Sequence, residues 1–434
     1  MAIFYLLVSG MPLVNQPLFS RFVEQLTMMK YLGIACLFYA LLHVALKRSL
    51  PSGWRGRLAI LLVIFYAWVA FSYWTKGNHQ NWQLSPFLSL TSFLLLYWIV
   101  VAVVDTEDRL RWTIYAAIAS VGVGAVYMVR EWKEYHLLYA NFRPGYVVGD
   151  ANYFTLSALL CLPLSYFMLQ ERRPWWERGF LVGSILITLV AVALAASRGG
   201  LLGLVVVCLF IVVRSRHRVR NLLVVGALLV AVVALTPVSS LDRLLHPDYS
   251  DVAAEQDRLV VWKAGLHMIE SHPWVGIGLG NFKPSVAAYE DGRSKVVSLA
   301  HNTYIGMAAE LGLPGLAMFL GLLGMALHLA AQACRRAGPE VSTLRQATLG
   351  VQAGLLGCVV GIFFLSADQQ KLLWLMLFLT PCLAHLAEVG ARARNNAITL
   401  ARASTPEWGG AVVPAGAESG SLGDWARDLA GIFR

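Results

Sequence analysis

Long apolar runs alternate with short polar segments along almost the whole chain. Two of them, "LAILLVIFYAWVAFSYW" at 58–74 and "NLLVVGALLVAVVALTPV" at 221–238, are nearly long enough to cross a bilayer. A spanning helix needs about 20 residues, because each residue adds about 1.5 Å towards a hydrocarbon core of about 30 Å. The pattern therefore predicts about 12 spanning helices, near residues 2–15, 27–46, 58–74, 87–104, 112–129, 151–169, 179–196, 200–214, 221–238, 301–330, 346–365 and 371–389.

The polar connections between these runs alternate in charge. Lys and Arg are concentrated in every second one, namely "KRSLPSGWRGR", "DTEDRLR", "ERRPWWER", "RSRHRVR", "CRRAGPEVSTLR" and the tail "ARARNN". Cytoplasmic loops carry an excess of positive charge, so we assign these connections and both termini to the cytoplasm. The remaining connections, which include "SRGG", "SADQQK" and one long loop, then face the other side of the membrane.

This topology sets the organisation of the chain. We expect helices 1–9 within 1–238, a long periplasmic loop with an amphipathic helix at 239–300, helices 10–12 within 301–389, and a cytoplasmic C-terminal tail at 390–434. The first apolar run, Ala2–Leu18, is interrupted by Pro12 and Pro17. The predicted fold class is an all-α polytopic membrane protein.

Composition narrows the class of protein further. Only 14% of the residues are charged and 58% are hydrophobic, whereas about a quarter of an ordinary globular domain is charged. The net charge of +10 resides in the short connections, so it indicates membrane topology and not a nucleic-acid partner. The six cysteines lie in or beside apolar runs without a CxxC pair, which is typical of small core residues.

The most unusual of the apolar segments is "SLAHNTYIGMAAELGLPGLAMFL" at 298–320. His301 and Asn302 stand at its head, where an ionisable group is costly and therefore a functional candidate. A helix cap at the water interface is the alternative. At 100° per residue, Gly312 and Gly315 would share one helix face with His301 and clear space below it. A neutral imidazole could take a proton from a hydroxyl, with Asn302 or the loop orienting its second nitrogen.

Two arginines on the same predicted side could bind an anion. Arg198 lies in the "SRGG" turn, where the two glycines let the backbone turn tightly and approach another group. Arg258 lies on a predicted loop helix whose apolar stripe is Leu259, Trp262, Leu266 and Ile269. The alternatives are snorkelling to lipid headgroups for Arg198 and a solvated side chain for Arg258.

Other polar residues are secondary candidates. Asp368 in "SADQQK" and Asp150 in "GDANYF" could each pair with His301 or an arginine, or could be ordinary helix-end groups. The chain has no HExxH or DxD motif and no clustered histidine pair, so we predict neither a metal site nor a cofactor.

Together these features resemble the O-antigen ligase and polymerase superfamily. The resemblance rests on "HN" followed by nine residues and "GLPG", on the "SRGG" turn, and on "HPWVGIGLGNF" within a long late loop. It implies a GT-C-like architecture in the bacterial inner membrane with the active site facing the periplasm. It also implies that Arg198 and Arg258 bind a diphosphate and that His301 is catalytic, with Asn302, Asp368 and Asp150 as possible support.

The activity that this resemblance implies is an inverting, metal-independent glycosyl transfer. An O-antigen ligase moves O-antigen polysaccharide from undecaprenyl diphosphate to a sugar hydroxyl of the lipid A–core. An O-antigen polymerase or a protein O-oligosaccharide ligase of the same superfamily is the near alternative. A polytopic transporter or flippase is the alternative of another class, although we find none of the two-fold repeats that many transporters show. The expected partners are the lipid-linked donor, the lipid A–core acceptor and membrane lipids, with no nucleic acid.

Overall fold

In the computed structural model, the described part of the chain is helical and contains no strand. It covers residues 1–13, 28–77, 86–138, 142–146, 148–214, 218–235, 249–290, 298–338 and 342–404. The elements are α1 (Ala2–Gly10), α3 (Met28–Lys47), the 3₁₀ helix η1 (Ser52–Arg55), α4 (Arg57–Lys76), α5 (Pro86–Val103), α6 (Glu107–Tyr135), α7 (Ala151–Met168), α8 (Trp175–Ala195), α9 (Arg198–Arg214), α10 (Arg218–Leu235), α12 (Tyr249–Ser271), α13 (Phe282–Tyr289), α14 (Thr303–Arg336), α15 (Thr343–Gly361) and α16 (Lys371–Ser404).

Every predicted span except the first corresponds to one of these helices. Eight helices of the described chain are long and apolar enough to cross a membrane: α3, α4, α5, α6, α7, α8, α14 and the Lys371–Ala397 part of α16. The first predicted span contains only the nine-residue α1, which is too short to cross a bilayer by itself. The protein is therefore a multi-pass membrane protein whose described elements are all helices, whereas a total of 12 spans stays a prediction.

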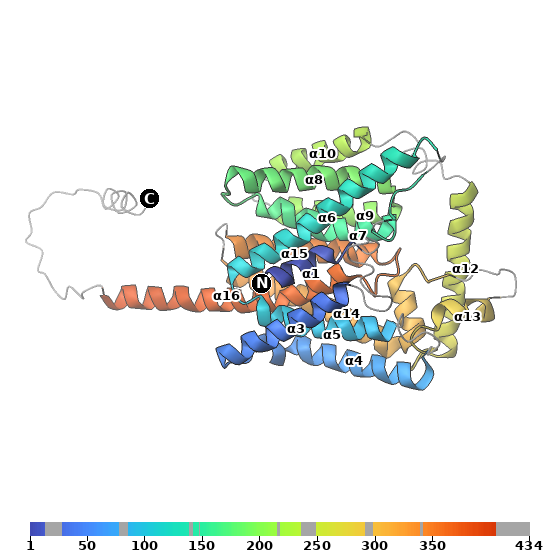
Figure 1. Cartoon of the computed structure of the whole chain (residues 1–434), viewed down its shortest axis with the longest axis horizontal. Coiled ribbons are helices and arrows are strands. Elements are labelled where there is room, and N and C mark those ends of the chain that lie inside the picture. The colour runs from blue at the N-terminus through green and yellow to red at the C-terminus, as the bar shows by residue number, and fades with distance from the viewer. Residues whose placement is uncertain are drawn as a thin grey trace, which may run out of the picture. The chain divides into compact units, whose positions relative to one another are not determined.

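The chain divides into a large unit, Met1–Ala391, and a smaller one, Arg392–Arg434. Within the large unit, α7 and α15 pack side by side, and α9, α6 and α8 lie around them (Figure 1). In the smaller unit the described residues 392–404 are helical. The predicted C-terminal tail beyond residue 404 lies outside the described residues.

Glycines allow α15 to approach its neighbours closely, as their spacing in "LGVQAGLLGCVVG" predicts. A side chain at Gly354 would come within 2.9 Å of the Leu160 carbonyl oxygen of α7. A side chain at Gly357 would come within 2.6 Å of Val207 and 3.1 Å of the Gly203 carbonyl oxygen of α9. These glycines are packing residues, and they hold α15 against α7 and α9.

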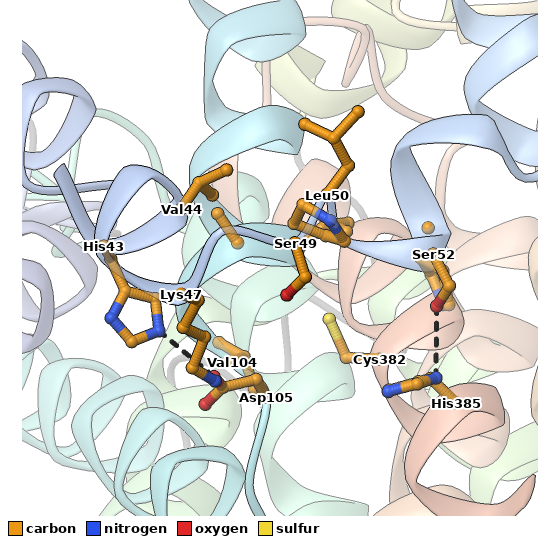
Figure 2. Close-up of a pocket in the computed structure, with 15 residues that line it drawn as sticks. His43, Val44, Lys47, Ser49, Leu50, Ser52, Val104, Asp105, Cys382 and His385 are labelled. Carbon is orange, nitrogen blue, oxygen red and sulfur yellow. Dashed lines mark hydrogen bonds and ion pairs between the residues drawn. The ribbon is translucent and has the colours of Figure 1, made fainter. Parts of the chain in front are cut away.

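The connections rich in Lys and Arg lie at one end of the helices, and the less basic connections lie at the opposite end. At one end, Thr343 donates a hydrogen bond to Glu171, 2.8 Å away, and His43 Nε2 lies 3.1 Å from Asp105 Oδ2 (Figure 2). At the other end, Asn281 donates to the Lys76 carbonyl at 2.6 Å. Because α4 starts at Arg57 and ends at Lys76, it connects the basic end with the end that carries the long loop.

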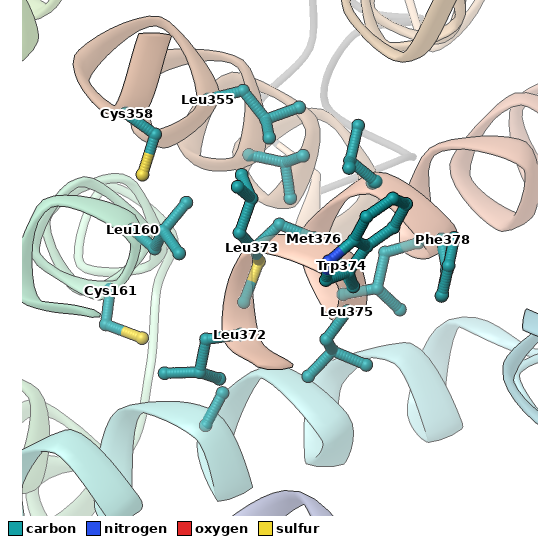
Figure 3. Packing of buried hydrophobic residues seen from close by; sticks show 14 of the residues in the cluster. Leu160, Cys161, Leu355, Cys358, Leu372, Leu373, Trp374, Leu375, Met376 and Phe378 are labelled. Carbon is teal, nitrogen blue, oxygen red and sulfur yellow. The ribbon is translucent and has the colours of Figure 1, made fainter. Parts of the chain in front are cut away.

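The core between the helices is apolar and well filled. Side chains of α7, α15 and α16 meet around Trp374, which is 1% exposed (Figure 3). Its ring stacks on Phe93 with centroids 5.3 Å apart, and its indole nitrogen donates to the Asp368 carbonyl at 2.7 Å. Five of the six cysteines are buried, Cys208 is half-buried, and all are free thiols, which confirms their prediction as core residues.

Candidate functional site

His301 lies two residues before the start of α14 and is half-buried. Its backbone is in the left-handed region, with φ of 46°, which is costly for a residue that carries a Cβ. The residue before it is fixed, because the Trp262 indole nitrogen of α12 donates to the Ala300 carbonyl at 2.8 Å. Such strain persists only where the surrounding structure holds it, as it does at functional sites.

The two residues after His301 fix the start of α14. Asn302 Oδ1 accepts hydrogen bonds from the backbone nitrogens of Tyr304 (2.9 Å) and Ile305 (3.1 Å), which makes Asn302 the N-cap. Its Nδ2 is buried without a hydrogen-bond partner, so Asn302 does not orient the imidazole in this structure. Of the two interpretations offered for Asn302, a helix cap and a residue that orients the imidazole, the structure supports the helix cap.

Thr303 joins the start of α14 to the connection between α15 and α16. Its hydroxyl donates to the Leu365 carbonyl at 2.6 Å and accepts from the Ala367 nitrogen at 2.9 Å. Its backbone nitrogen donates to the Ile362 carbonyl at 2.9 Å. The "SADQQK" segment thus lies beside the start of α14.

Electrostatics favours a neutral His301. Burial lowers the pKa of its imidazole from the ordinary 6.5, and the positive charge of Arg258 lowers it further. The carboxylate of Asp150 acts in the opposite direction and raises it. The structure thus brings His301, Arg258 and Asp150 into one electrostatic group, in which the imidazole can accept a proton at neutral pH.

Arg258 is half-buried on α12, which packs on α14 at a glycine. A side chain at Gly265 would come within 2.5 Å of Ile305, so the two helices touch there. Trp262 lies one turn after Arg258 on the same side, because residues four apart are neighbours on a helix. The Trp262 bond to Ala300 therefore fixes the face that carries Arg258 next to His301.

The apolar stripe predicted for this loop helix is confirmed in part, because Ile269 packs on the buried cluster and Trp262 packs on Phe363, whereas the two leucines do not face inward. Leu259 and Leu266 are 57% and 50% exposed, whereas the buried residues are Val261, Ala264 and Met268. These three pack on Phe282, Val286, Ala300 and Ala309. The large leucines stay outside because close contact with α13 and α14 requires smaller or more flexible side chains on the inner face.

Arg198 is the first residue of α9 and is exposed. The sharp turn before it is made by Ala196, with φ of 45°, and not by the two glycines as we predicted. Gly199 and Gly200 are helical and allow close packing instead, because side chains there would come within 2.6 Å of Phe364 and 2.1 Å of Thr155. Two glycines thus hold the start of α9 tightly against α7 and the α15–α16 connection.

A small cavity lies where the start of α9 meets α7. It is lined by Asn152, Leu156, Leu159, Ser197, Gly199, Gly200, Gly361, Phe364 and Leu365. Arg198 stands between two of these residues in the chain. Asp150, the N-cap of α7, accepts from the Asn152 nitrogen at 2.7 Å. The starts of α7, α9 and α14 therefore surround the same region.

Arg143 is a third arginine of this region, which the sequence did not single out. Its Nε donates to the Ala195 carbonyl at 2.9 Å, and its Nη2 donates to Asn152 Oδ1 at 3.1 Å. Glu131 fixes the same connection by accepting from the Gly145 nitrogen at 2.8 Å. The sequence contained one indication of this role, because Arg143 is a cation in one of the less basic connections, on the same predicted side as Arg198 and Arg258.

Asp368 lies near this region in the α15–α16 connection. Burial raises the pKa of its carboxyl group, although hydrogen bonds to the carboxylate, including one from Gln369, oppose the shift. Tyr153 of α7 donates to the neighbouring Ser366 carbonyl at 2.6 Å. Asp368 is therefore held close to the starts of α7 and α14, and whether it pairs with His301 stays a prediction.

Gly312 does not share a helical face with His301, which corrects our expectation. His301 precedes the helix, and α14 is broken at Gly312, where φ is 72° and ψ is 177°. The break receives the "HPWVGIGLGNF" segment, because the Leu313 nitrogen donates to the Pro273 carbonyl at 2.8 Å and the Ile277 nitrogen donates to the Ala309 carbonyl at 2.8 Å. The glycine therefore positions the long loop, and it does not clear space under the imidazole.

Glu310 completes this attachment. Its Oε1 accepts from the Phe282 nitrogen at the start of α13, 2.9 Å away. Its backbone carbonyl accepts from the Gly278 nitrogen at 3.1 Å. The loop that carries Arg258 is thus bonded directly to the helix that follows His301.

Comparison with known proteins gives one family. Residues 183–320 match the family model described as O-antigen ligase, and this stretch contains Arg198, Arg258 and His301. No curated protein matches the chain.

Proposed function

We propose that the chain, whose residues 183–320 match the O-antigen ligase family model, is a glycosyltransferase of the bacterial inner membrane. In this proposal it transfers O-antigen polysaccharide from undecaprenyl diphosphate to a sugar hydroxyl of the lipid A–core, on the periplasmic side. The observation that carries the proposal is the electrostatic group of His301, Arg258 and Asp150 beside the start of α9.

The proposed chemistry assigns one task to the histidine. The acceptor hydroxyl oxygen attacks the anomeric carbon of the donor, and neutral His301 takes the hydroxyl proton. The bond between that carbon and the diphosphate oxygen breaks, and undecaprenyl diphosphate leaves with the bonding electrons. Attack opposite the leaving group inverts the anomeric centre.

The proposed role of the arginines is to bind the diphosphate. Guanidinium groups present several fixed donors to phosphate oxygens and keep their charge at all relevant pH values. Donors placed where charge develops stabilise the transition state, a contribution commonly worth about 10²–10³ in rate for a single donor. Arg198 is exposed at the start of α9 and Arg258 acts on His301, so we assign both to the leaving group. Arg143 is the candidate for a third contact.

The experiment that tests this function is transfer in vitro. Purified full-length protein receives a defined lipid-linked O-antigen donor and purified lipid A–core in liposomes, with EDTA present and no ion gradient. We expect a new glycosidic product that contains the core. Donor movement without product would indicate a transporter and would contradict the proposal.

A deletion strain separates the ligase from its near alternatives. Loss of the whole lipopolysaccharide ladder with intact core and accumulated lipid-linked polymer supports the ligase. A core that carries one repeat unit indicates a polymerase. An unchanged ladder with loss of glycosylated protein indicates a protein O-oligosaccharide ligase.

A further inference from the structure

A second pocket lies at the end of the helices opposite His301. It is open, measures about 240 Å³, and lies between α3, α5, α16 and the connection that contains η1. Lys47 and Asp105 stand on one side of it, and Ser52 and His385 stand on the other (Figure 2). The "KRSLPSGWRGR" connection, one of the connections rich in Lys and Arg, contributes one part of the pocket wall.

The charges at this pocket do not balance. Asp105 is the only acidic side chain among the described residues that line it, and Lys47 donates directly to its carboxylate. Arg109 Nη1 donates to the other carboxylate oxygen at 2.7 Å, and His43 Nε2 lies 3.1 Å away from Oδ2. Arg109 does not line the pocket, but it shares the Asp105 carboxylate with Lys47, so the cluster of Asp105, Lys47 and Arg109 beside the pocket carries one more positive than negative charge.

Polar donors in the pocket could bind the oxygens of an anion. The Lys47 ammonium has three N–H donors, only one of which Asp105 requires, and its side chain is 49% exposed. Across the pocket, Ser52 Oγ lies 3.1 Å from His385 Nδ1, and both residues are exposed. A single phosphate group placed between these two sides would compensate the excess charge.

The surface beside the pocket is apolar and exposed. Leu50 lines the pocket and is 54% exposed. Leu46, Leu42 and Phe38 of α3 are also exposed, and only 11% of the apolar window of α3 is buried. Acyl chains could lie along α3 while the headgroup occupies the pocket, an arrangement that a soluble anion would not use.

We propose that this pocket binds the phosphate headgroup of an anionic phospholipid, with its acyl chains along the exposed side of α3. Basic pockets between membrane helices are suited to anionic headgroups because the ligand supplies the missing negative charge. The extra positive charge of this cluster favours phosphatidylglycerol-type lipids over zwitterionic ones, whose cationic end would meet Lys47. This proposal does not depend on the proposed glycosyl transfer.

The test is a lipid titration of the delipidated full-length protein in detergent, followed by native mass spectrometry. The probes are phosphatidylglycerol and phosphatidylcholine with the same acyl chains, and inorganic phosphate. We expect tighter binding of phosphatidylglycerol, which Lys47→Gln weakens about fivefold, the typical contribution of one basic residue to an anionic lipid surface. The matched control is Lys30→Gln at the other end of α3, which should bind as the unchanged protein does.

Three outcomes would overturn the proposal. They are equal binding of the two lipids, an equal effect of Lys47→Gln and Lys30→Gln, and binding of inorganic phosphate without a preference between the lipids. Lys47 contacts Asp105, so its loss could disturb folding. His385→Ala is the second variant, because it leaves the Asp105 cluster intact. It should also weaken phosphatidylglycerol binding, and an unchanged affinity would contradict the proposal.

Discussion

His301 combines a strained backbone with a perturbed side chain. Its φ of 46° is maintained by the Trp262 bond to Ala300 on one side and by the Asn302 cap and Thr303 bonds on the other. The lowered pKa keeps the imidazole neutral. Both features depend on residues distant in sequence, such as Trp262 and Arg258, so the proposed role of His301 rests on contacts as well as on residue type.

Replacing His301 tests its role as the base. We expect His301→Ala to lower the rate of transfer about 10²–10⁴-fold, the usual contribution of a general base. His267→Ala is the matched control, because His267 is exposed on the same loop, where Nδ1 lies 3.2 Å from the Tyr289 carbonyl oxygen. The measurement is product formation in vitro. Wild-type rates with His301→Ala would exclude the base assignment.

The neighbours of His301 should shift its pKa in opposite directions. Arg258→Gln removes a positive charge, which raises the pKa and moves loss of the neutral form to higher pH. Asp150→Asn removes a negative charge, which lowers the pKa, while the amide oxygen can still cap α7. NMR titration of the His301 ring in both variants checks the signs without relying on activity. Shifts of the same sign would show that one of the two charges does not act on His301.

At the scale of elements, the broken helix α14 joins the site to the long loop. Its first part starts at the Asn302 cap, and its break at Gly312 receives the segment between α12 and α13. Pro314 fits directly after the break, because proline is tolerated in the first turn of a helical segment. The "GLPG" motif thus builds the attachment of the loop that carries Arg258.

Gly312→Ala should therefore detach this loop. The new Cβ would lie 2.4 Å from the Trp274 carbonyl oxygen, and a φ of 72° is strained for alanine, at a cost of about 1–3 kcal/mol. We expect lower transfer and faster proteolysis of the loop. Gly324→Ala is the matched control in the same helix, because nothing lies within 4 Å of its Cβ position. Equal behaviour of the two variants would contradict this role of Gly312.

The glycines of α15 should control stability. Gly354→Ala places a Cβ 2.9 Å from the Leu160 carbonyl oxygen, a backbone atom that moves only with α7. We expect a clearly lower unfolding temperature in detergent, since overpacking commonly costs about 1–3 kcal/mol. Gly183→Ala in α8 has open space around its Cβ and should leave stability unchanged or raise it. If Gly354→Ala unfolds at the wild-type temperature, α7 and α15 are less closely packed than described.

At the scale of the whole molecule, the two ends of the helices differ in the charge of their connections. The basic connections around Asp105 and Thr343 lie at one end, and the loop that carries Arg258 lies at the other. The positive-inside rule then predicts that the site faces the periplasm. This sidedness is a property of the complete chain, because it follows from all connections together.

Labelling of introduced cysteines tests this sidedness. Lys283→Cys in α13 should react with a membrane-impermeant maleimide in cells with a permeable outer membrane. Ser49→Cys, exposed at the basic end, should react only after lysis. The native thiols should give little background, because Cys208 is half-buried and the other five are buried. The reverse labelling pattern would place His301 in the cytoplasm and would contradict the proposed function.

The sequence by itself determined where the helices lie and which residues are candidates for the site. Backbone groups in a bilayer must form their hydrogen bonds within one segment, so apolar run lengths alone specify where helices lie. The boundaries of α4, α5, α7 and α15 agree with the prediction to within a few residues. Candidate site residues could likewise be chosen from residue type alone, because an imidazole can accept a proton and a guanidinium can bind an anion whatever the fold.

Only the tertiary structure decided how these parts meet. The buried side of α12, the break at Gly312, the turn at Ala196 and the bonds of Arg143 depend on contacts between residues far apart in the chain. Side chains of similar hydrophobicity compete for the inner face, and size and shape at the contact select among them. Local periodicity cannot resolve that competition, because it contains no information about the partner surface.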